Sequence, residues 1–202
     1  MKNRIILLLT LISIAVSAQD SIPAKKRIIS FSPQYLINYG VRLDFERKIS
    51  PNKYLVIAPQ LYLAEQNNKT DDILTDIDDF NLLAGTGLAV SIKNFALKDG
   101  NFGAYLGYGL FYNYYYTEYF EDAEFEPEEV KANIHKMGFD IILGYQLVLY
   151  DVAIVDIYTG MAARKSFIDN GDYSDERFTS SPLGYNLTGN IFLLGIKIGI
   201  MY

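Results

Sequence analysis

The sequence of 202 residues contains no cysteine, no tryptophan and only one histidine. The absence of cysteine excludes disulfide bonds, thiolate metal sites and cysteine nucleophiles. A basic excess is also missing, because 18 lysines and arginines stand against 24 aspartates and glutamates, for a net charge of −6. Nucleic-acid-binding proteins carry a basic electrostatic footprint, so the composition argues against that class of function.

Long apolar runs are confined to the start of the chain. Two basic residues among the first four precede an apolar run over residues 5–16, and small residues lead up to Ala18. This order is typical of a secretory signal peptide, and the run is shorter than the ~20 residues that a spanning helix needs. We therefore expect residues 1–18 to be removed on export and residues 19–202 to form one domain. No cysteine follows the expected cleavage site, which excludes a lipoprotein anchor.

Elsewhere apolar residues recur at every second position, most clearly in the last stretch of the chain, residues 187–202. The odd positions of this stretch are smaller or polar and include Gly195, Lys197 and Gly199. Side chains of a β-strand point alternately to its two faces, so the stretch predicts one strand with an apolar face and a polar, glycine-rich face. The apolar face carries Phe192, Leu194, Ile196, Ile198, Ile200 and Tyr202.

The same alternation predicts further strands before the last one. They are expected at residues 26–37, 40–49, 53–64, 81–97, 102–120, 134–149 and 152–167. Each is about long enough for the roughly 9–11 residues that a tilted membrane strand requires. Short turns alternate with long polar loops, which are expected at residues 65–79, 121–133 and 168–186. The predicted fold class is therefore all-β: an eight-stranded antiparallel up-and-down transmembrane β-barrel.

Alternation alone does not decide which face of the strands points inward. A soluble lipocalin-like barrel turns its apolar face inward, whereas a membrane barrel turns it outward. Charges and glycines share the polar face, as a narrow lumen requires, and the long loops fall opposite the carboxy terminus, as in outer-membrane barrels. These features favour the membrane barrel; a secreted lipocalin-like ligand-binding barrel is the alternative. The predicted charge network of the lumen consists of Arg42, Asp44, Glu46, Lys93, Asp140, Asp156, Arg164 and Lys197.

One run resembles a known family. Residues 32–49, SPQYLINYGVRLDFERKI, combine an apolar strand, a short turn and a second strand with the aromatic-Glu-Arg triplet 45–47 near its end. This pattern is similar to the first hairpin of small bacterial outer-membrane β-barrels of the type of outer-membrane proteins X and A. The resemblance implies a location in the cell outer membrane, with outer-membrane lipid as the surrounding partner.

The end of the chain carries a second resemblance to these barrels. Their closing strand ends on a lipid-facing aromatic residue that the barrel assembly machinery reads, and this chain ends on Tyr202 with apolar residues stepping back by twos. The resemblance implies that machinery as a partner during biogenesis. The implied assembly signal consists of Phe192, Ile196, Ile198, Ile200 and Tyr202.

Tyrosines crowd one end of the strand expected at 102–120 and run toward an outer loop. In a membrane barrel they are typical of an aromatic girdle at the lipid–water interface, and a carbohydrate- or lipid-binding platform is the alternative. The predicted girdle comprises Tyr112, Tyr114, Tyr115, Tyr116 and Tyr119.

The outer loops are acidic, with five aspartates over residues 71–79 and a further acidic run over 121–129. Such loops predict a solvated outer surface that is available to a partner. The spacing of their carboxylates does not match a calcium-binding loop, so we predict neither a metal site nor a cofactor.

Catalysis would depend on the single histidine, His135. Some eight-stranded barrels, the lipid-A deacylases, resemble serine hydrolases, with His and Ser two positions apart on a lipid-facing strand. Here position 137 is Met, and the nearest serines in sequence, Ser91 and Ser166, fall on other predicted strands. A His-dependent triad lacks a local nucleophile, so we predict a non-enzymatic barrel with a closed polar lumen that acts in envelope structure or through its loops. A lipid-modifying outer-membrane enzyme is the alternative.

Overall fold

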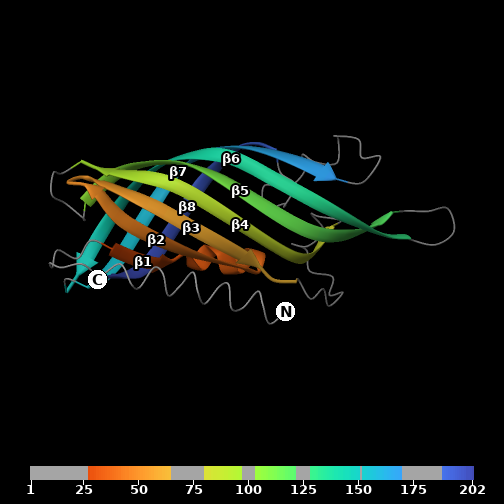
Figure 1. Ribbon diagram of the computed structural model, residues 1–202, viewed down its shortest axis with the longest axis horizontal. Helices are drawn as coiled ribbons and strands as arrows, with labels where there is room; N and C mark the ends of the chain where they lie inside the picture. Colours follow the sequence, from red (N-terminus) through yellow and green to blue (C-terminus); the bar gives the residue numbers. More distant parts are fainter. Residues whose placement is uncertain (1–26, 65–79, 97–102, 122–127, 151, 170–187) are drawn as a thin grey trace.

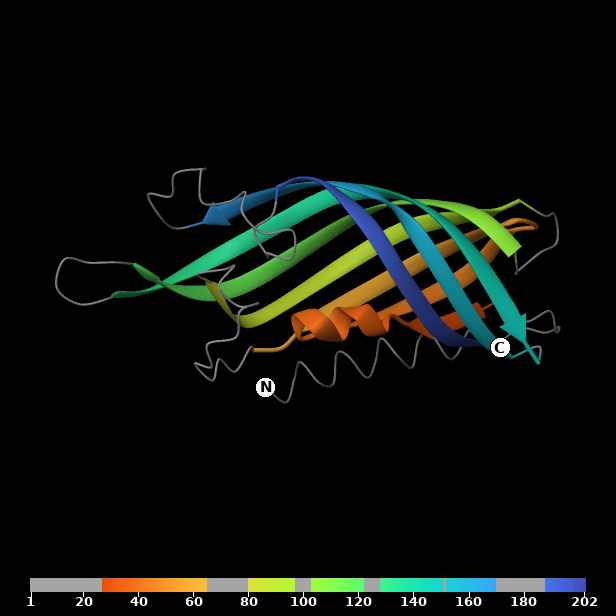
Figure 2. The same cartoon turned by 180° about the vertical axis from the view of Figure 1, so that it is seen from behind.

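The computed structural model describes residues 27–64, 80–96, 103–121, 128–150, 152–169 and 188–202. In this part of the chain, eight antiparallel strands follow one another in sequence order around a closed barrel. Every strand pairs with the next and the last pairs with the first, as Figures 1 and 2 show from opposite sides. The predicted eight-stranded antiparallel up-and-down β-barrel is confirmed. The predicted signal peptide lies outside the described residues.

The strands differ in length, from 5 residues in the first to 22 in the sixth. They are β1 (Arg27–Phe31), β2 (Gly40–Ser50), β3 (Lys53–Tyr62), β4 (Phe80–Phe95), β5 (Gly103–Glu121), β6 (Glu128–Leu149), β7 (Ala153–Asp169) and β8 (Gly189–Met201). A short 3-10 helix, η1 (Pro33–Asn38), lies between β1 and β2. Within the described ranges, no helix has the length and apolar character needed to cross a membrane.

The segment before β2 departs from the prediction. The alternation predicts a strand over residues 26–37, but β1 ends at Phe31 and residues 33–38 form η1 instead. Pro33 explains the difference, because proline lacks the N–H that a strand ladder needs and its fixed φ suits the start of a helix. Tyr39 then adopts a left-handed conformation, with a φ of 50°, and leads into β2. As a result, β1 and β8 share only four residue pairs.

The hairpin of β5 and β6 is longer than predicted. The sequence predicts an acidic loop over residues 121–133, yet β6 begins at Glu128 and its first residues pair with the end of β5, up to Glu121 opposite Glu128. Figure 1 shows this hairpin projecting beyond the neighbouring strands. A high content of acidic residues therefore does not end the ladder here, because backbone pairing does not depend on apolar side chains.

Burial alternates along the strands in the sense opposite to that of a soluble barrel. Large apolar side chains are exposed on the outer wall, for example Leu143 at 61% and Leu194 at 72%. Charged side chains are buried in the interior, including Asp44 at 0% exposure and Lys93 at 1%. The polar faces of the strands therefore line the lumen.

Leu82 is an exception to the predicted facing of β4. It is fully buried, whereas the alternation predicts it on the outer face together with Leu88 and Val90. The register between β4 and β5 shifts between Leu82 and Ala84, so a β-bulge reverses the facing of the strand at this point. Leu82 packs inside the barrel in a cluster with Tyr62.

A second apolar cluster fills the interior near the end that carries the carboxy terminus. It includes Tyr54, Phe95 and Tyr105, with Phe95 in ring contact with both tyrosines. Gly144 makes room for this packing, because a Cβ at that position would collide with the Tyr105 ring. The charged residues of the interior lie between this cluster and the cluster that contains Leu82.

Candidate functional site

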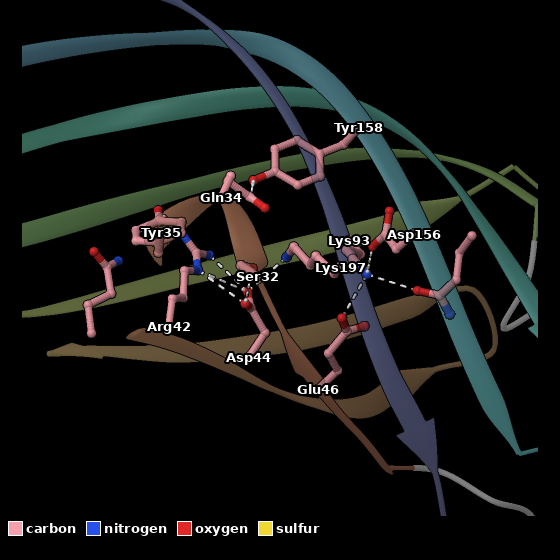
Figure 3. A network of polar contacts seen from close by, with 12 residues as sticks. Ser32, Gln34, Tyr35, Arg42, Asp44, Glu46, Lys93, Asp156, Tyr158 and Lys197 are labelled. Atoms are coloured by element: carbon pink, nitrogen blue, oxygen red, sulfur yellow. Dashed lines mark hydrogen bonds and ion pairs between the residues drawn. The ribbon is translucent and has the colours of Figure 1, made fainter. Parts of the chain in front are cut away.

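Six charged side chains meet inside the barrel, and we term them the lumen network. They are Arg42, Asp44, Glu46, Lys93, Asp156 and Lys197. They come from β2, β4, β7 and β8 and point toward one another, as Figure 3 shows. Their shared orientation follows from strand alternation, because all of them occupy inward positions. All six belong to the charge network predicted from the sequence.

Lys93 occupies the centre of one half of the lumen network. Its Nζ donates hydrogen bonds to Glu46 Oε1 at 2.7 Å, to Asp156 Oδ2 at 2.6 Å and to Gln146 Oε1 at 2.9 Å. The Tyr105 hydroxyl donates to Asp156 Oδ1 at 2.8 Å, and Lys93 Nζ lies 4.7 Å from the centre of the Tyr105 ring. Because an ammonium group has three donors, all of them are used. One side chain of β4 thereby connects β2, β6 and β7 across the lumen.

Asp44 occupies the centre of the other half. Its Oδ1 accepts hydrogen bonds from Arg42 Nη2 at 2.9 Å and from Lys197 Nζ at 2.8 Å. Its Oδ2 accepts from Arg42 Nε and from the Ser32 hydroxyl, both at 3.1 Å. The guanidinium therefore binds the carboxylate through two nitrogens, which is the strong geometry for this pair. Arg42 Nη1 also donates to the Tyr35 hydroxyl at 2.8 Å, which ties η1 to β2.

The two halves of the lumen network carry opposite charge. Lys93 stands between two carboxylates, whereas Asp44 stands between two bases. Moving a charged group out of water costs several kcal/mol, and ion pairs with additional hydrogen bonds offset that cost. Each of the six groups has at least one ion-pair partner, so the arrangement stabilises the barrel only as long as it stays complete.

Asp140 and Arg164 also line the interior, in the wall of a cavity that Arg42, Lys93 and Lys197 line as well. Neither makes an ion pair within 4.0 Å to a residue of the described chain. Asp140 lies opposite Ala162 and Arg164 lies opposite Gly138, farther along β6 and β7 than the network. Among the described residues these two charges therefore form no direct ion pair with the other six, although the charges of Arg42, Lys197 and Arg164 act on the Asp140 carboxyl.

A cavity of about 210 Å³ adjoins the lumen network, and Asp140 and Arg164 belong to its wall. Lys136 lines it as well; this side chain is 4% exposed, and its Nζ lies 5.3 Å from the centre of the Tyr115 ring. The predicted charge network omits Lys136, although it shares the inward face of β6 with Gly138 and Asp140. Its position in the alternation was sufficient to find it.

Uncharged side chains complete the polar interior. The Tyr158 hydroxyl accepts a hydrogen bond from Gln34 Nε2 at 2.8 Å, and the Tyr62 hydroxyl donates to Gln60 Oε1 at 2.7 Å. Sequence reasoning did not identify these residues. Tyrosines that face the lumen and tyrosines that face outward are alike in composition, so only the register of each strand distinguishes them.

The tyrosines of β5 divide between the two faces of the strand. Tyr112 is 43% exposed on the outer face, and Tyr114 and Tyr116 are half-buried at positions of the same parity. Tyr115 is a correction to the predicted girdle: it is 4% exposed and packs inside against another buried tyrosine, at 5.0 Å between ring centres. Odd positions of this strand face the lumen. The side chain of Tyr119 lies outside the described part of the structure.

His135 lies between two of these tyrosines. It is opposite Tyr114 in the register, with ring centres 5.3 Å apart, and its Nδ1 lies 2.7 Å from the Tyr112 hydroxyl. Ser166 pairs with Lys136, so it faces the other side of the wall from His135. In the described residues, no group of three His, Cys, Asp or Glu side chains is placed to hold a metal ion. The local geometry packs the imidazole against tyrosine rings, and among the described residues no serine is hydrogen-bonded to it.

The residues of the implied assembly signal are exposed on the outer face of β8 and at the position directly after it. They are Phe192, Ile196, Ile198, Ile200 and Tyr202, with exposures between 37% and 68%. The Tyr202 N–H donates to the Arg27 carbonyl at 2.9 Å, and the Arg27 N–H donates to the Tyr202 carbonyl at 3.2 Å. The final residue therefore helps to close the barrel. The aspartates of residues 71–79 lie outside the described ranges.

Comparisons with protein-family models, with curated proteins and with solved structures find no match for this chain. The closed eight-stranded barrel is an architecture that outer-membrane barrels share with soluble lipocalin-like barrels. The strand topology therefore agrees with both classes, which differ in the facing of their apolar side chains.

Proposed function

We propose that this protein is a non-enzymatic β-barrel of the bacterial outer membrane, of the type of outer-membrane proteins X and A, and a structural element of the cell envelope. One observation carries the proposal: the outer wall is apolar and the interior is charged. A membrane barrel has this distribution because lipid surrounds it. A lipocalin-like barrel has the opposite distribution, because its apolar interior holds the ligand.

The apolar wall runs around the barrel. Large apolar side chains are exposed on every strand from β2 to β8, for example Phe45, Ile57, Leu88, Leu110, Leu143, Ile157 and Leu194. Soluble monomers rarely expose contiguous apolar patches larger than roughly a few hundred Å². An apolar wall on seven neighbouring strands therefore supports a lipid environment.

The lumen network supports a closed interior rather than a transport pathway. Eight strands enclose room for side chains or for one small ligand, but not for a wide aqueous channel. Lys93 reaches from β4 to carboxylates on β2 and β7, so charged side chains cross the lumen at this level. A filled interior favours a structural role over passage of solutes.

Two further features support a role at the envelope surface. The exposed apolar face of β8 ends on Tyr202, which fits the signal that the barrel assembly machinery reads in the resembled family. The hairpin of β5 and β6 extends past its neighbours in Figure 1, and the sequence around its tip is acidic. We propose that this side of the barrel contacts a partner outside the membrane.

Cell fractionation and gel migration test the location. The protein should fractionate with the outer membrane and leave it only in detergent. Because the backbone groups of a closed barrel are paired around the ring, the folded protein should resist SDS until it is boiled, which changes its migration. Recovery in the soluble fraction without detergent would contradict the proposal.

The non-enzymatic assignment has a separate test. The purified barrel in lipid should leave lipid A and phospholipid unchanged, as followed by mass spectrometry of the lipids. Turnover that is present in the wild type and in Lys53→Ala, but absent in His135→Ala, would reassign the protein to the lipid-modifying enzymes.

A further inference from the structure

The cavity beside the lumen network has a mainly basic wall. Its bases are Arg42, Lys93, Lys136, Arg164 and Lys197. The only acid among its lining residues is Asp140. Asp44, Glu46 and Asp156, which neutralise the network, do not line the cavity, so the ion pairs present their basic partners to it. Basic groups around a low-dielectric space concentrate a positive potential, which attracts an anion.

Arg164 is the clearest candidate to bind that anion. Its guanidinium lies 5.7 Å from the centre of the Phe111 ring and makes no ion pair within the described chain. Its Nε is buried and has no hydrogen-bond partner among the described residues. The side chain as a whole is partly buried, and a single buried donor that lacks an acceptor is costly. A bound anion would supply the missing acceptor.

Lys136 lies within reach of the same anion. It is opposite Ser166, two positions from Arg164 on β7, so the two bases are diagonal neighbours on the inner face. Long side chains in this relation can reach a common point. Two acceptors of the wall, Gln34 Oε1 and Asn113 Oδ1, also have no hydrogen-bond partner in the part of the chain that the structure describes. They fit a ligand that brings its own hydroxyl or water, as a singly protonated phosphate does.

Next to this cavity the strand ladder covers only part of the boundary between β8 and β1, although the ring of eight strands is closed. β8 pairs with β1 only over residues 198–201, and over residues 189–197 it has β7 on one side and no described strand on the other. η1 takes the place of a strand there, and Figure 2 shows η1 and β8 converging toward the carboxy-terminal end. Gln34 of η1 reaches across to Tyr158 of β7. We term the boundary between η1 and residues 189–197 of β8, where Gln34 comes close to Gly195, the seam.

The cavity extends to the seam. Its wall includes Gln34 and Tyr35 of η1 and Ile191, Leu193 and Leu194 of β8. Leu194 is also 72% exposed on the outer wall. A single layer of β8 therefore separates the cavity from the apolar outer surface beside the seam.

We propose that the cavity binds the phosphate head group of an anionic amphiphile, whose alkyl chain leaves through the seam and lies along the outer wall beside Leu194. Arg164 and Lys136 bind the phosphate. The cavity volume of about 210 Å³ is large enough for a hydrated phosphate. The proposal rests on the proposed membrane location, because the chain needs an apolar environment.

Native mass spectrometry tests the site on the folded barrel, released from a neutral detergent in the presence of dodecyl phosphate. The wild type should retain one molecule of it. Arg164→Gln should weaken retention about tenfold or more, because a charge-assisted hydrogen bond is lost. Arg47→Gln, at an exposed position of β2, should leave retention unchanged. Lys136→Gln should weaken retention as well. If Arg164→Gln does not fold, Lys136→Gln alone tests the site.

Two further probes separate the sources of the anion. Inorganic phosphate should bind much more weakly than dodecyl phosphate, and equal retention would overturn the amphiphile in favour of a free anion. Dodecanol should not be retained, and equal retention would overturn recognition by charge. Retention that is absent in the wild type, or unchanged in both Arg164→Gln and Lys136→Gln, would overturn the site. These measurements use folded protein in detergent, so their outcome is independent of the cell fractionation that tests the membrane location.

Discussion

At the scale of single residues, Lys93 connects its own strand, β4, to three other strands of the barrel. Its side chain is 1% exposed, and its ammonium binds Glu46, Asp156 and Gln146 from three other strands. The Tyr105 ring packs against the same group. Truncating one member of a buried charge cluster leaves the other members charged and without a partner. The loss of stability on removing Lys93 therefore comes mainly from the buried carboxylates that would lose their base.

We expect Lys93→Met to lower the free energy of unfolding by about 3–5 kcal/mol, because two carboxylates would stay buried without a base. Denaturant titration of the barrel in detergent, followed by the mobility shift between folded and unfolded protein, measures the change. Lys53→Met, at the exposed start of β3, is the control and should have little effect.

A triple variant separates charge from packing. Lys93→Met combined with Glu46→Gln and Asp156→Asn removes the leftover charges while it keeps similar shapes. It should be less destabilised than Lys93→Met alone. A triple variant that is less stable than the single one would mean that the ion pairs themselves, rather than the avoidance of unpaired charge, stabilise the interior.

Leu143 provides the matching experiment on the outer wall. It is 61% exposed, and its neighbours on the same face of β6, Ile141 and Tyr145, are also exposed. A lysine within the lipid-facing belt costs roughly 2–4 kcal/mol near the bilayer midplane. Leu143→Lys should therefore destabilise the barrel in lipid vesicles more than Leu143→Ala does. Equal stability of the two variants in lipid would argue that this face meets water.

At the scale of elements, the sequence predicts which face of a strand each side chain lies on. It does not predict where a helix or a bulge interrupts the strand. Every even position of β8 from Phe192 to Ile200 is exposed, as the alternation predicts. In η1, Tyr35 and Ile37 keep the same spacing of two, so the pattern predicts a strand where a helix forms. Only Pro33 signals the interruption. The bulge beside Leu82 has no compositional signal, because it arises from the register between two strands.

η1 has two distinct sides that cysteine labelling can distinguish. Ile37 is 73% exposed, whereas Gln34 is hydrogen-bonded inside the barrel to Tyr158. The chain has no native cysteine, so Ile37→Cys and Gln34→Cys each give one labelling site. In lipid vesicles, an environment-sensitive fluorophore at position 37 should report apolar surroundings and be quenched by lipid-borne quenchers.

The label at position 34 should be quenched much less, and a label on Lys53→Cys, at the exposed start of β3, should report water. Stronger lipid quenching at position 34 than at position 37 would mean that η1 is turned the other way, with its apolar side in the lumen.

At the scale of the whole molecule, the pairing of charges depends on the tilt and stagger of all strands. Asp156 and Lys197 lie directly opposite each other on β7 and β8. Yet Asp156 binds Lys93 of β4, and Lys197 binds Asp44 of β2. The sequence predicts which charges share the inward face, because the alternation of side chains along a strand is a local property. It does not predict their partners, because the shear of a closed barrel is a global one.

The filled lumen predicts an electrical property of the intact barrel. Reconstituted into a planar bilayer, the purified protein should give no steady ion current, because the lumen network crosses the barrel from β2 to β7 through Lys93. A closed, low-dielectric interior keeps these charges paired, whereas a hydrated channel would separate them.

The control is a variant that removes the charged side chains spanning the lumen, Lys93→Ala with Glu46→Ala and Asp156→Ala. It should raise the background conductance if it folds. Reproducible single-channel steps from the wild type, with ion selectivity altered by Arg42→Ala or Arg164→Ala, would show instead that water and ions pass beside the network and that the barrel is a pore.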